Sequence, residues 1–221
     1  MSFNSLRTTL IATFALSVVA FAQPATLDHF YQVRYVANLN LGDSVVNITN
    51  SGALGAGLAA GTTAATTGAI CVNVYAFSPD EQMISCCSCP VTPNGLVSLS
   101  ARRDLVNNTL TPAVPTSIVV KLLATIPVGT TCSGSAASAG TVTSGMLAWG
   151  TTVHAGALPG SAPVVTETPF LPATLSVGAP TAIDIGEISR LRQLCTFINA
   201  NGSGFGICST CRLGGLGAGR L

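Results

Sequence analysis

The residues of this chain that could most clearly take part in chemistry are its eight cysteines. They are Cys71, Cys86, Cys87, Cys89, Cys132, Cys195, Cys208 and Cys211. A dense cysteine block and a C-x-x-C pair are compatible with a redox couple, with zinc or iron–sulfur ligation, or with disulfides. No histidine follows Cys211, so the motif for covalent c-type haem attachment is absent. The choice among the remaining chemistries depends on the compartment in which the chain works.

The first 22 residues have the three-part pattern of an export signal. A positive charge at Arg7 precedes an apolar run over 10–21, and Ala20-Phe21-Ala22 has the small-x-small form of a cleavage site. The apolar run is shorter than the roughly 20 residues that a spanning helix needs. We therefore expect 1–22 to be a signal peptide and the mature chain to be secreted, to the cell surface or beyond. An uncleaved anchor helix is the less favoured alternative.

Export favours disulfides, because exported thiols meet an oxidising environment. We expect the eight cysteines to form bridges, with no metal ligands and no cofactor. The number of pairings is on the order of a hundred, so most stay open. Cys86 and Cys87 are neighbours on extended backbone and point to opposite faces, which predicts two different bridges. Cys195 lies on the apolar side of a predicted helix, and we expect it to pair with Cys208 or Cys211.

Other groups that catalyse reactions are sparse. The histidines are His29 and His154, and no G-x-S-x-G elbow accompanies them. The carboxylates are scattered along the chain, at Asp28, Asp43, Asp80, Glu81, Asp104, Glu167, Asp184 and Glu187. Two carboxylates across a cleft would suit glycoside hydrolysis, which makes a hydrolase the third-ranked hypothesis. We expect no enzymatic activity.

The elements that position these groups are mostly β-strands. Eight segments have strand composition or periodicity, namely 31–41, 44–49, 70–77, 82–86, 96–101, 116–126, 146–155 and 166–175. Period-two alternation over 31–41 is typical of a half-buried strand. With 44–49 it is expected to form a hairpin around Gly42-Asp43. Proline at 169 and 172 predicts that the last segment is an edge strand or an extended loop.

Turn and loop signals separate these segments. Pro93-Asn94-Gly95 predicts a turn, because proline presets φ and Asn-Gly tolerates positive φ. The stretches 51–68 and 129–145 consist mainly of small residues and have little to bury, so they are expected to be loops. The glycines of 51–68 lack the Lys-Ser/Thr ending of a phosphate loop.

One helix is expected near the end of the chain, over 184–199. Asp184 followed by Glu187 resembles a capping box, and Asn201-Gly202 provides a stop. Its apolar face consists of Ile188, Leu191, Leu194, Cys195 and Ile198. Many short strands without alternating helices predict an all-β fold, an antiparallel β-sandwich or barrel, with this helix over an edge or an end.

The expected organisation is one β domain with a helical end. Residues 23–183 form the sandwich with its loops at 51–68 and 129–145, and residues 184–221 form the helix and a Cys- and Gly-rich tail packed on the same domain. Only 8% of the residues are charged, and removal of Arg7 with the signal leaves a formally neutral chain. Neutrality argues against nucleic acid as a partner, and no second apolar stretch predicts a transmembrane segment.

The block ICVNVYAF at 70–77, the block CCSCPVTPNGL at 86–96 and the ending over 202–215 resemble exported, cysteine-rich bacterial proteins with no known activity. The resemblance implies a bacterial, exported context and no site residues.

A neutral, small-residue surface promotes association. We expect a structural subunit that assembles with copies of itself into a filament, sheath or surface layer. The alternative is an adhesin or binding module for surface glycan or protein, with Tyr31, Tyr35, Tyr75 or Trp149 stacking on a sugar.

Overall fold

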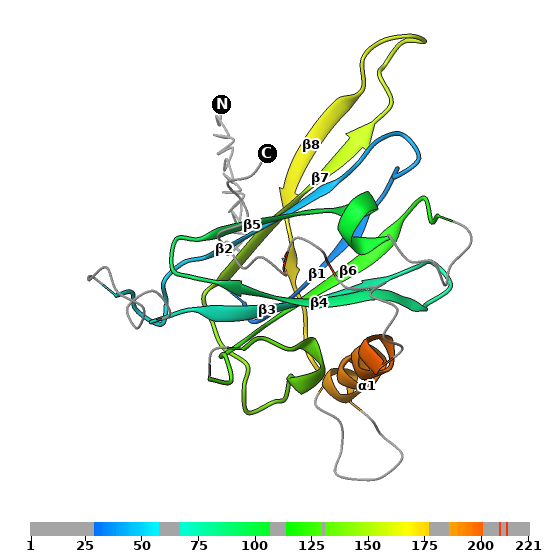
Figure 1. The fold of residues 1–221 in the computed structure, drawn as a ribbon. Coiled ribbons are helices and arrows are strands. Elements are labelled where there is room, and N and C mark those ends of the chain that lie inside the picture. Colours follow the sequence, from blue (N-terminus) through cyan, green and yellow to red (C-terminus); the bar gives the residue numbers. More distant parts are fainter. Residues whose placement is uncertain are drawn as a thin grey trace, which may run out of the picture.

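Two antiparallel sheets and one helix make up the fold (Figure 1). The computed structural model describes residues 29–57, 67–106, 114–129, 131–176, 186–200, 208 and 211. The expected signal peptide at 1–22 lies outside these residues. The first sheet has the order β4-β3-β6-β1-β9, formed by Met83–Val91, Ile70–Phe77, Ile118–Thr125, Tyr31–Val36 and Leu171–Pro172. The second has the order β5-β2-β7-β8, formed by Leu96–Ser100, Val45–Asn50, Met146–His154 and Val164–Pro169.

The predicted antiparallel sandwich with one helix near the C-terminus is confirmed. Every predicted strand segment contains a strand, and 166–175 is divided into β8 and β9 by Phe170. A hydrophobic core fills the space between the sheets, with Val36 and Leu122 from the first and Ile48 and Met146 from the second. Alternate residues of β2, β3 and β6 face this core, as the period-two pattern requires.

The helix adds a third layer on the outer face of the first sheet. α1 (Glu187–Ala200) buries Ile188, Leu191, Cys195 and Ile198, and these side chains share a second core cluster with Tyr75, Phe77 and Leu123 of that sheet. The helix therefore covers a sheet face, not an edge or an end as expected. This second cover explains why all eight residues of β3 are buried. The predicted Asp184 cap lies outside the described residues.

Two polar side chains of β3 find partners in these layers. The Asn73 side-chain amide donates to the carbonyl of Leu123 at 3.0 Å, and its oxygen accepts from the Ser88 hydroxyl at 2.6 Å. The Tyr75 hydroxyl donates to the Gly134 carbonyl at 2.8 Å, within the short 3-10 helix η3 (Gly134–Ala136) of the predicted loop 129–145. Burial raises the pKa of the Tyr75 hydroxyl, so this donor stays protonated.

The predicted hairpin of 31–41 with 44–49 is wrong. β1 ends at Val36 and pairs with β6 and β9, whereas β2 pairs with β5 and β7 in the other sheet. The connection crosses between the sheets, where Leu39 is buried and its N–H donates to the Thr116 carbonyl at 2.8 Å. Val36 and Val46 meet in the same core. Period-two alternation indicates that a strand has a buried face, but it does not identify the neighbouring strand. The apolar Tyr31 and Val33 of β1 pack in the second, outer cluster.

The turn at Pro93-Asn94-Gly95 is confirmed, and it joins the two sheets through β4 and β5. Asn94 has a φ of 61°, in the left-handed region that asparagine tolerates. A Cβ at Gly95 would lie 2.8 Å from the Thr92 carbonyl oxygen, so only glycine fits this close approach.

In the part of the chain that the structure describes, the helices are too short or too polar to cross a membrane.

Candidate functional site

All eight cysteines are in disulfides, as predicted. The pairs are Cys71–Cys132, Cys86–Cys195, Cys87–Cys208 and Cys89–Cys211. The expected pairing of Cys195 with Cys208 or Cys211 is wrong, because Cys195 is bonded to the sheet. Four disulfides fit an extracellular, oxidising environment.

The pleat of β4 explains this connectivity. Cys86 and Cys87 point to opposite faces, so they do belong to different bridges. Cys86 packs in the outer cluster and meets Cys195 of the helix. Cys87 and Cys89 share the inner face, and they meet Cys208 and Cys211 in the core between the sheets. α1 is thus bonded to the outer face of the edge strand β4, and the chain after α1 is bonded to its inner face.

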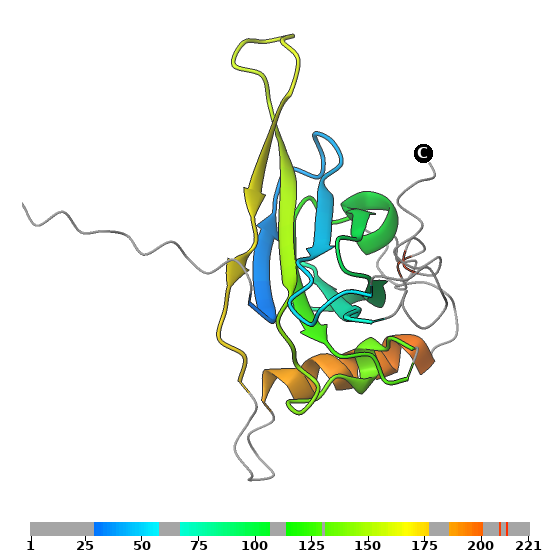
Figure 2. The same ribbon diagram turned by 90° about the vertical axis from the view of Figure 1, so that its left-hand side faces the viewer.

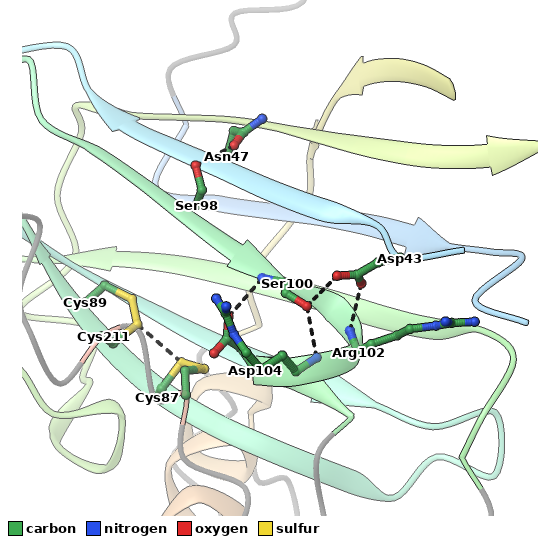
Figure 3. Close-up of polar contacts among 11 residues, drawn as sticks. Asp43, Asn47, Cys87, Cys89, Ser98, Ser100, Arg102, Asp104 and Cys211 are labelled. Atoms are coloured by element: carbon green, nitrogen blue, oxygen red, sulfur yellow. Dashed lines mark hydrogen bonds and ion pairs between the residues drawn. A yellow bond between two sulfur atoms is a disulfide. The ribbon is translucent and has the colours of Figure 1, made fainter. Parts of the chain in front are cut away.

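The inner-face sulfurs are close enough to resemble a metal site. The sulfurs of Cys87, Cys89 and Cys211 all lie within 4.8 Å of one another, and those of Cys87 and Cys211 are 3.7 Å apart (Figure 3). Metal binding needs thiolates, and each of these sulfurs is already in a disulfide. In the oxidised chain this cluster has a structural role.

A serine surrounded by carboxylates lies at the end of β5 (Figure 3). The Ser100 hydroxyl donates to Asp43 at 2.5 Å and accepts from the N–H of Arg103 at 2.9 Å. Asp104 accepts from the N–H of Ser100, and Asp43 from the N–H of Arg102, both at 2.9 Å. These bonds satisfy the free N–H groups at the start of the π-helical turn η2 (Ala101–Leu105), so helix capping accounts for them.

The predicted histidines lie away from that serine. The Nδ1 atom of His29 bonds the backbone of Tyr31 before β1, and Nε2 of His154 lies 2.9 Å from the Thr166 hydroxyl. Neither histidine contacts Ser100.

The remaining described carboxylates are dispersed as well. Glu187 pairs with Lys121 at 2.5 Å and Arg190 at 3.3 Å, and Glu167 accepts from the Asn47 amide at 2.9 Å. Asp80 and Glu81 are exposed in the β3–β4 turn. Asp28 and Asp184 lie outside the described residues.

The two lateral sides of the sandwich differ. One side carries the terminal strands β4 and β5, and β4 has three bonds to the helix and the tail. The other side, here named the β8–β9 side, carries the other terminal strand of each sheet, because β8 and β9 each pair with one neighbour among the described strands. Figure 2 shows these yellow strands along the left of the sandwich, away from the teal and green β3, β4 and β5. The edge position predicted from Pro169 and Pro172 is confirmed.

Apolar side chains are exposed along this side. Val164 and Val165 of β8 and Leu171 of β9 are each more than half exposed, and Tyr35 of β1 is 62% exposed. Unpaired strand edges with exposed apolar residues are sites where another chain adds. Of the aromatic residues expected to contact a sugar, Tyr31 and Tyr75 are buried and Trp149 is half-buried, so Tyr35 alone is free to do so.

A groove of about 510 Å³ opens on the β8–β9 side. It is here named the Arg34 groove, and its lining includes Arg34, Tyr35, Thr152, Thr168, Leu171 and Pro172. The Arg34 side chain extends from β1 onto β7 of the other sheet. A Cβ at Gly150 would lie 2.5 Å from its Nε atom, so the glycine makes room for the guanidinium.

Arg34 is a buried cation without an ion-pair partner among the described residues. The residue is 8% exposed, and its Nη1 donates to the Thr168 carbonyl at 2.8 Å and to the Thr168 hydroxyl. Nη2 donates to the Thr152 hydroxyl at 2.9 Å, and Nε has no partner. Burial lowers the pKa of the Arg34 guanidinium, and the charge of Glu167 opposes that shift.

The sequence analysis did not identify this site. Arg34 lies within the alternating segment 31–41, whose pattern predicts a half-buried strand but no site. The only available signal was Gly150 inside the strand over 146–155, since an interior strand glycine often marks close approach of another group.

Comparison with models of known protein families, with curated proteins and with solved structures gives no match to this chain. The resemblance to exported cysteine-rich bacterial proteins therefore stays a prediction.

Proposed function

We propose that this chain is a secreted, non-catalytic structural subunit that assembles with copies of itself outside the cell, and that the β8–β9 side is the contact surface. The observation that carries the proposal is the asymmetry of the sandwich. Disulfides tie the chain to the edge strand β4, whereas β8 and β9 are open edges with exposed valine, leucine and tyrosine.

Composition supports the same proposal. With 8% charged residues, the surface has little of the like-charge repulsion that keeps proteins apart. Disulfides on both faces of β4 make the subunit rigid, and a rigid subunit loses less conformational entropy when it binds.

The experiment is sedimentation velocity of the oxidised mature chain over a concentration series, with a charged variant of the edge. We expect the wild type to form species larger than the monomer as concentration rises. Val165→Lys is expected to raise the concentration of half-assembly at least about tenfold, because it places a charge on the apolar edge.

The matched control is Val114→Lys. Val114 is also an exposed valine, 69% against 59% for Val165, but it lies before β6 and outside the β8–β9 side. It should assemble like the wild type. A wild type that stays monomeric at every concentration contradicts the proposed function, and equal effects of the two lysines contradict the choice of surface.

A further inference from the structure

The Arg34 groove leaves specific hydrogen-bond donors unused. A guanidinium has five N–H donors, and the described residues accept three of them, at Thr168 twice and at Thr152. The donors left are Nε–H, which is buried beside Gly150, and one N–H of Nη2. A carboxylate that reaches the guanidinium from the groove would accept a charge-assisted hydrogen bond from Nη2.

An unpaired buried charge also has an energetic consequence. Moving a cation out of water is unfavourable unless a partner compensates. The charge of Glu167 favours ionised Arg34, but Glu167 forms no ion pair with it and instead accepts from the Asn47 amide. Arg34 is already removed from water in the folded chain. A carboxylate that enters the groove from outside would therefore bind it without a further cost for desolvating the guanidinium.

The β3–β4 turn carries the carboxylates that suit this groove. Residues 79–82 are all exposed, and within them Asp80 and Glu81 are adjacent. Neither forms an ion pair within the described residues. The Asp80 carboxylate accepts from the Ser78 hydroxyl, which lowers the pKa of Asp80, so the turn is negative at neutral pH.

The other described carboxylates are already engaged. Asp43 accepts from Ser100 and Arg102, and Asp104 and Glu187 are in ion pairs. Among the described carboxylates, Asp80 and Glu81 are thus an adjacent, exposed pair that forms no ion pair.

The turn joins β3 and β4, at one end of the strand order of the first sheet. The groove lies at β1 and β9, at the other end, and β6 separates the two pairs of strands. An interface between two different surfaces of the same molecule is heterologous, and it propagates from copy to copy unless the rotation closes a ring. A contact between turn and groove therefore gives a chain of subunits.

We propose that the Asp80–Glu81 turn of one copy inserts into the Arg34 groove of the next copy, where Arg34 binds a carboxylate of the turn. This head-to-tail contact rests on the proposed function and names the two surfaces that meet. The exposed Tyr35 and Leu171 at the groove surround the ion pair and shield it from water.

The test uses two variants that each remove one half of the contact. Arg34→Gln retains the turn, and Asp80→Asn/Glu81→Gln retains the groove. We expect each variant alone to require at least about tenfold more protein for assembly than the wild type, since loss of one partner leaves the other unpaired. Their mixture should form dimers and nothing larger, because one intact turn and one intact groove remain per pair.

Sedimentation velocity of the two variants, separately and mixed, measures this directly. Arg192→Gln, at an exposed arginine of α1, is the matched control and should assemble like the wild type. Near-ultraviolet circular dichroism checks that each variant is folded, and dimers in the mixture show in addition that both retain a working surface.

The outcomes separate this inference from the function on which it rests. If the wild type assembles and both variants assemble equally well, the turn–groove contact is wrong and the structural function stands. If the variants fail alone and the mixture forms no dimer, the contact is also wrong. A monomeric wild type overturns both.

Discussion

Removing the Cys71–Cys132 bridge is expected to cost more stability than removing Cys86–Cys195, although it spans 61 residues and the other spans 109. The change in each case is paired substitution of both cysteines by alanine. We expect losses in the free energy of unfolding of about 4 kcal/mol for Cys71–Cys132 and about 3 kcal/mol for Cys86–Cys195.

The reason lies in the unfolded chain. With Cys87–Cys208 intact, the Cys86–Cys195 bond closes a loop of only about 14 residues, thirteen from 195 to 208 and one from 87 to 86. The Cys71–Cys132 bond has no such neighbour and closes its full separation. Longer closed loops restrict the unfolded ensemble more.

Equilibrium unfolding in guanidinium chloride, under oxidising conditions, measures both losses. A non-reducing peptide map establishes that the other three bridges are unchanged in each variant. A Cys86→Ala/Cys195→Ala loss equal to or greater than that of Cys71→Ala/Cys132→Ala would show that anchoring of α1, and not loop closure, dominates.

Phe170→Ala is expected to lower the free energy of unfolding by about 3–5 kcal/mol. Phe170 is fully buried in the core between the sheets. It lies at the point where the chain passes from β8 to β9, and its N–H donates to the Ala148 carbonyl at 2.9 Å. Truncation leaves a cavity between the two edge strands that form the proposed contact surface.

The control for this substitution is Phe197→Ala on α1. Phe197 is 65% exposed, and its loss should change stability by no more than about 0.5 kcal/mol. Denaturant unfolding compares the two variants. Similar values for both would contradict the placement of Phe170 in the core.

Period-two alternation and turn chemistry were sufficient to predict the strands and the sandwich. The segment at 70–77 and the turn at Asn94 occur where expected. Strand partners were not predictable in the same way. Alternation over 31–41 required one buried face, but the apolar Tyr31 and Val33 pack in the outer cluster. The opposite face of β1, with Arg34 and Val36, is buried toward the other sheet.

For the cysteines too, local features were predictable from the sequence and tertiary partners were not. Local geometry predicted separate bridges for Cys86 and Cys87, because adjacent strand residues face opposite ways. The partner of Cys195 depended on which sheet face the helix covers, which is a tertiary property. The apolar face of 184–199 indicated burial but gave no information about the surface that buries it.

The candidate site was the least predictable feature. Arg34, Gly150 and Thr168 come from three strands in two sheets, and their approach depends on the packing of one sheet on the other. The acidic turn at Asp80 and Glu81 was visible in the sequence, but its relation to a buried arginine required the fold.

A sandwich tied by disulfides at β4 and open at β8–β9 is suited to addition of further copies at the open side. In the proposed assembly the acidic turn is a second surface, distinct from the first, for the next copy. Such contacts propagate from copy to copy unless the rotation closes a ring.

Amide hydrogen exchange, compared between dilute monomer and assembled protein, tests the assignment of the contact surface most directly. Exchange is expected to slow in Val164–Pro169, the edge strand β8, on assembly. It should stay unchanged in Leu96–Ser100, which is the edge strand at the other end of the same sheet. Equal exchange of β8 in both samples, or protection confined to β5, would contradict the role proposed for the β8–β9 side.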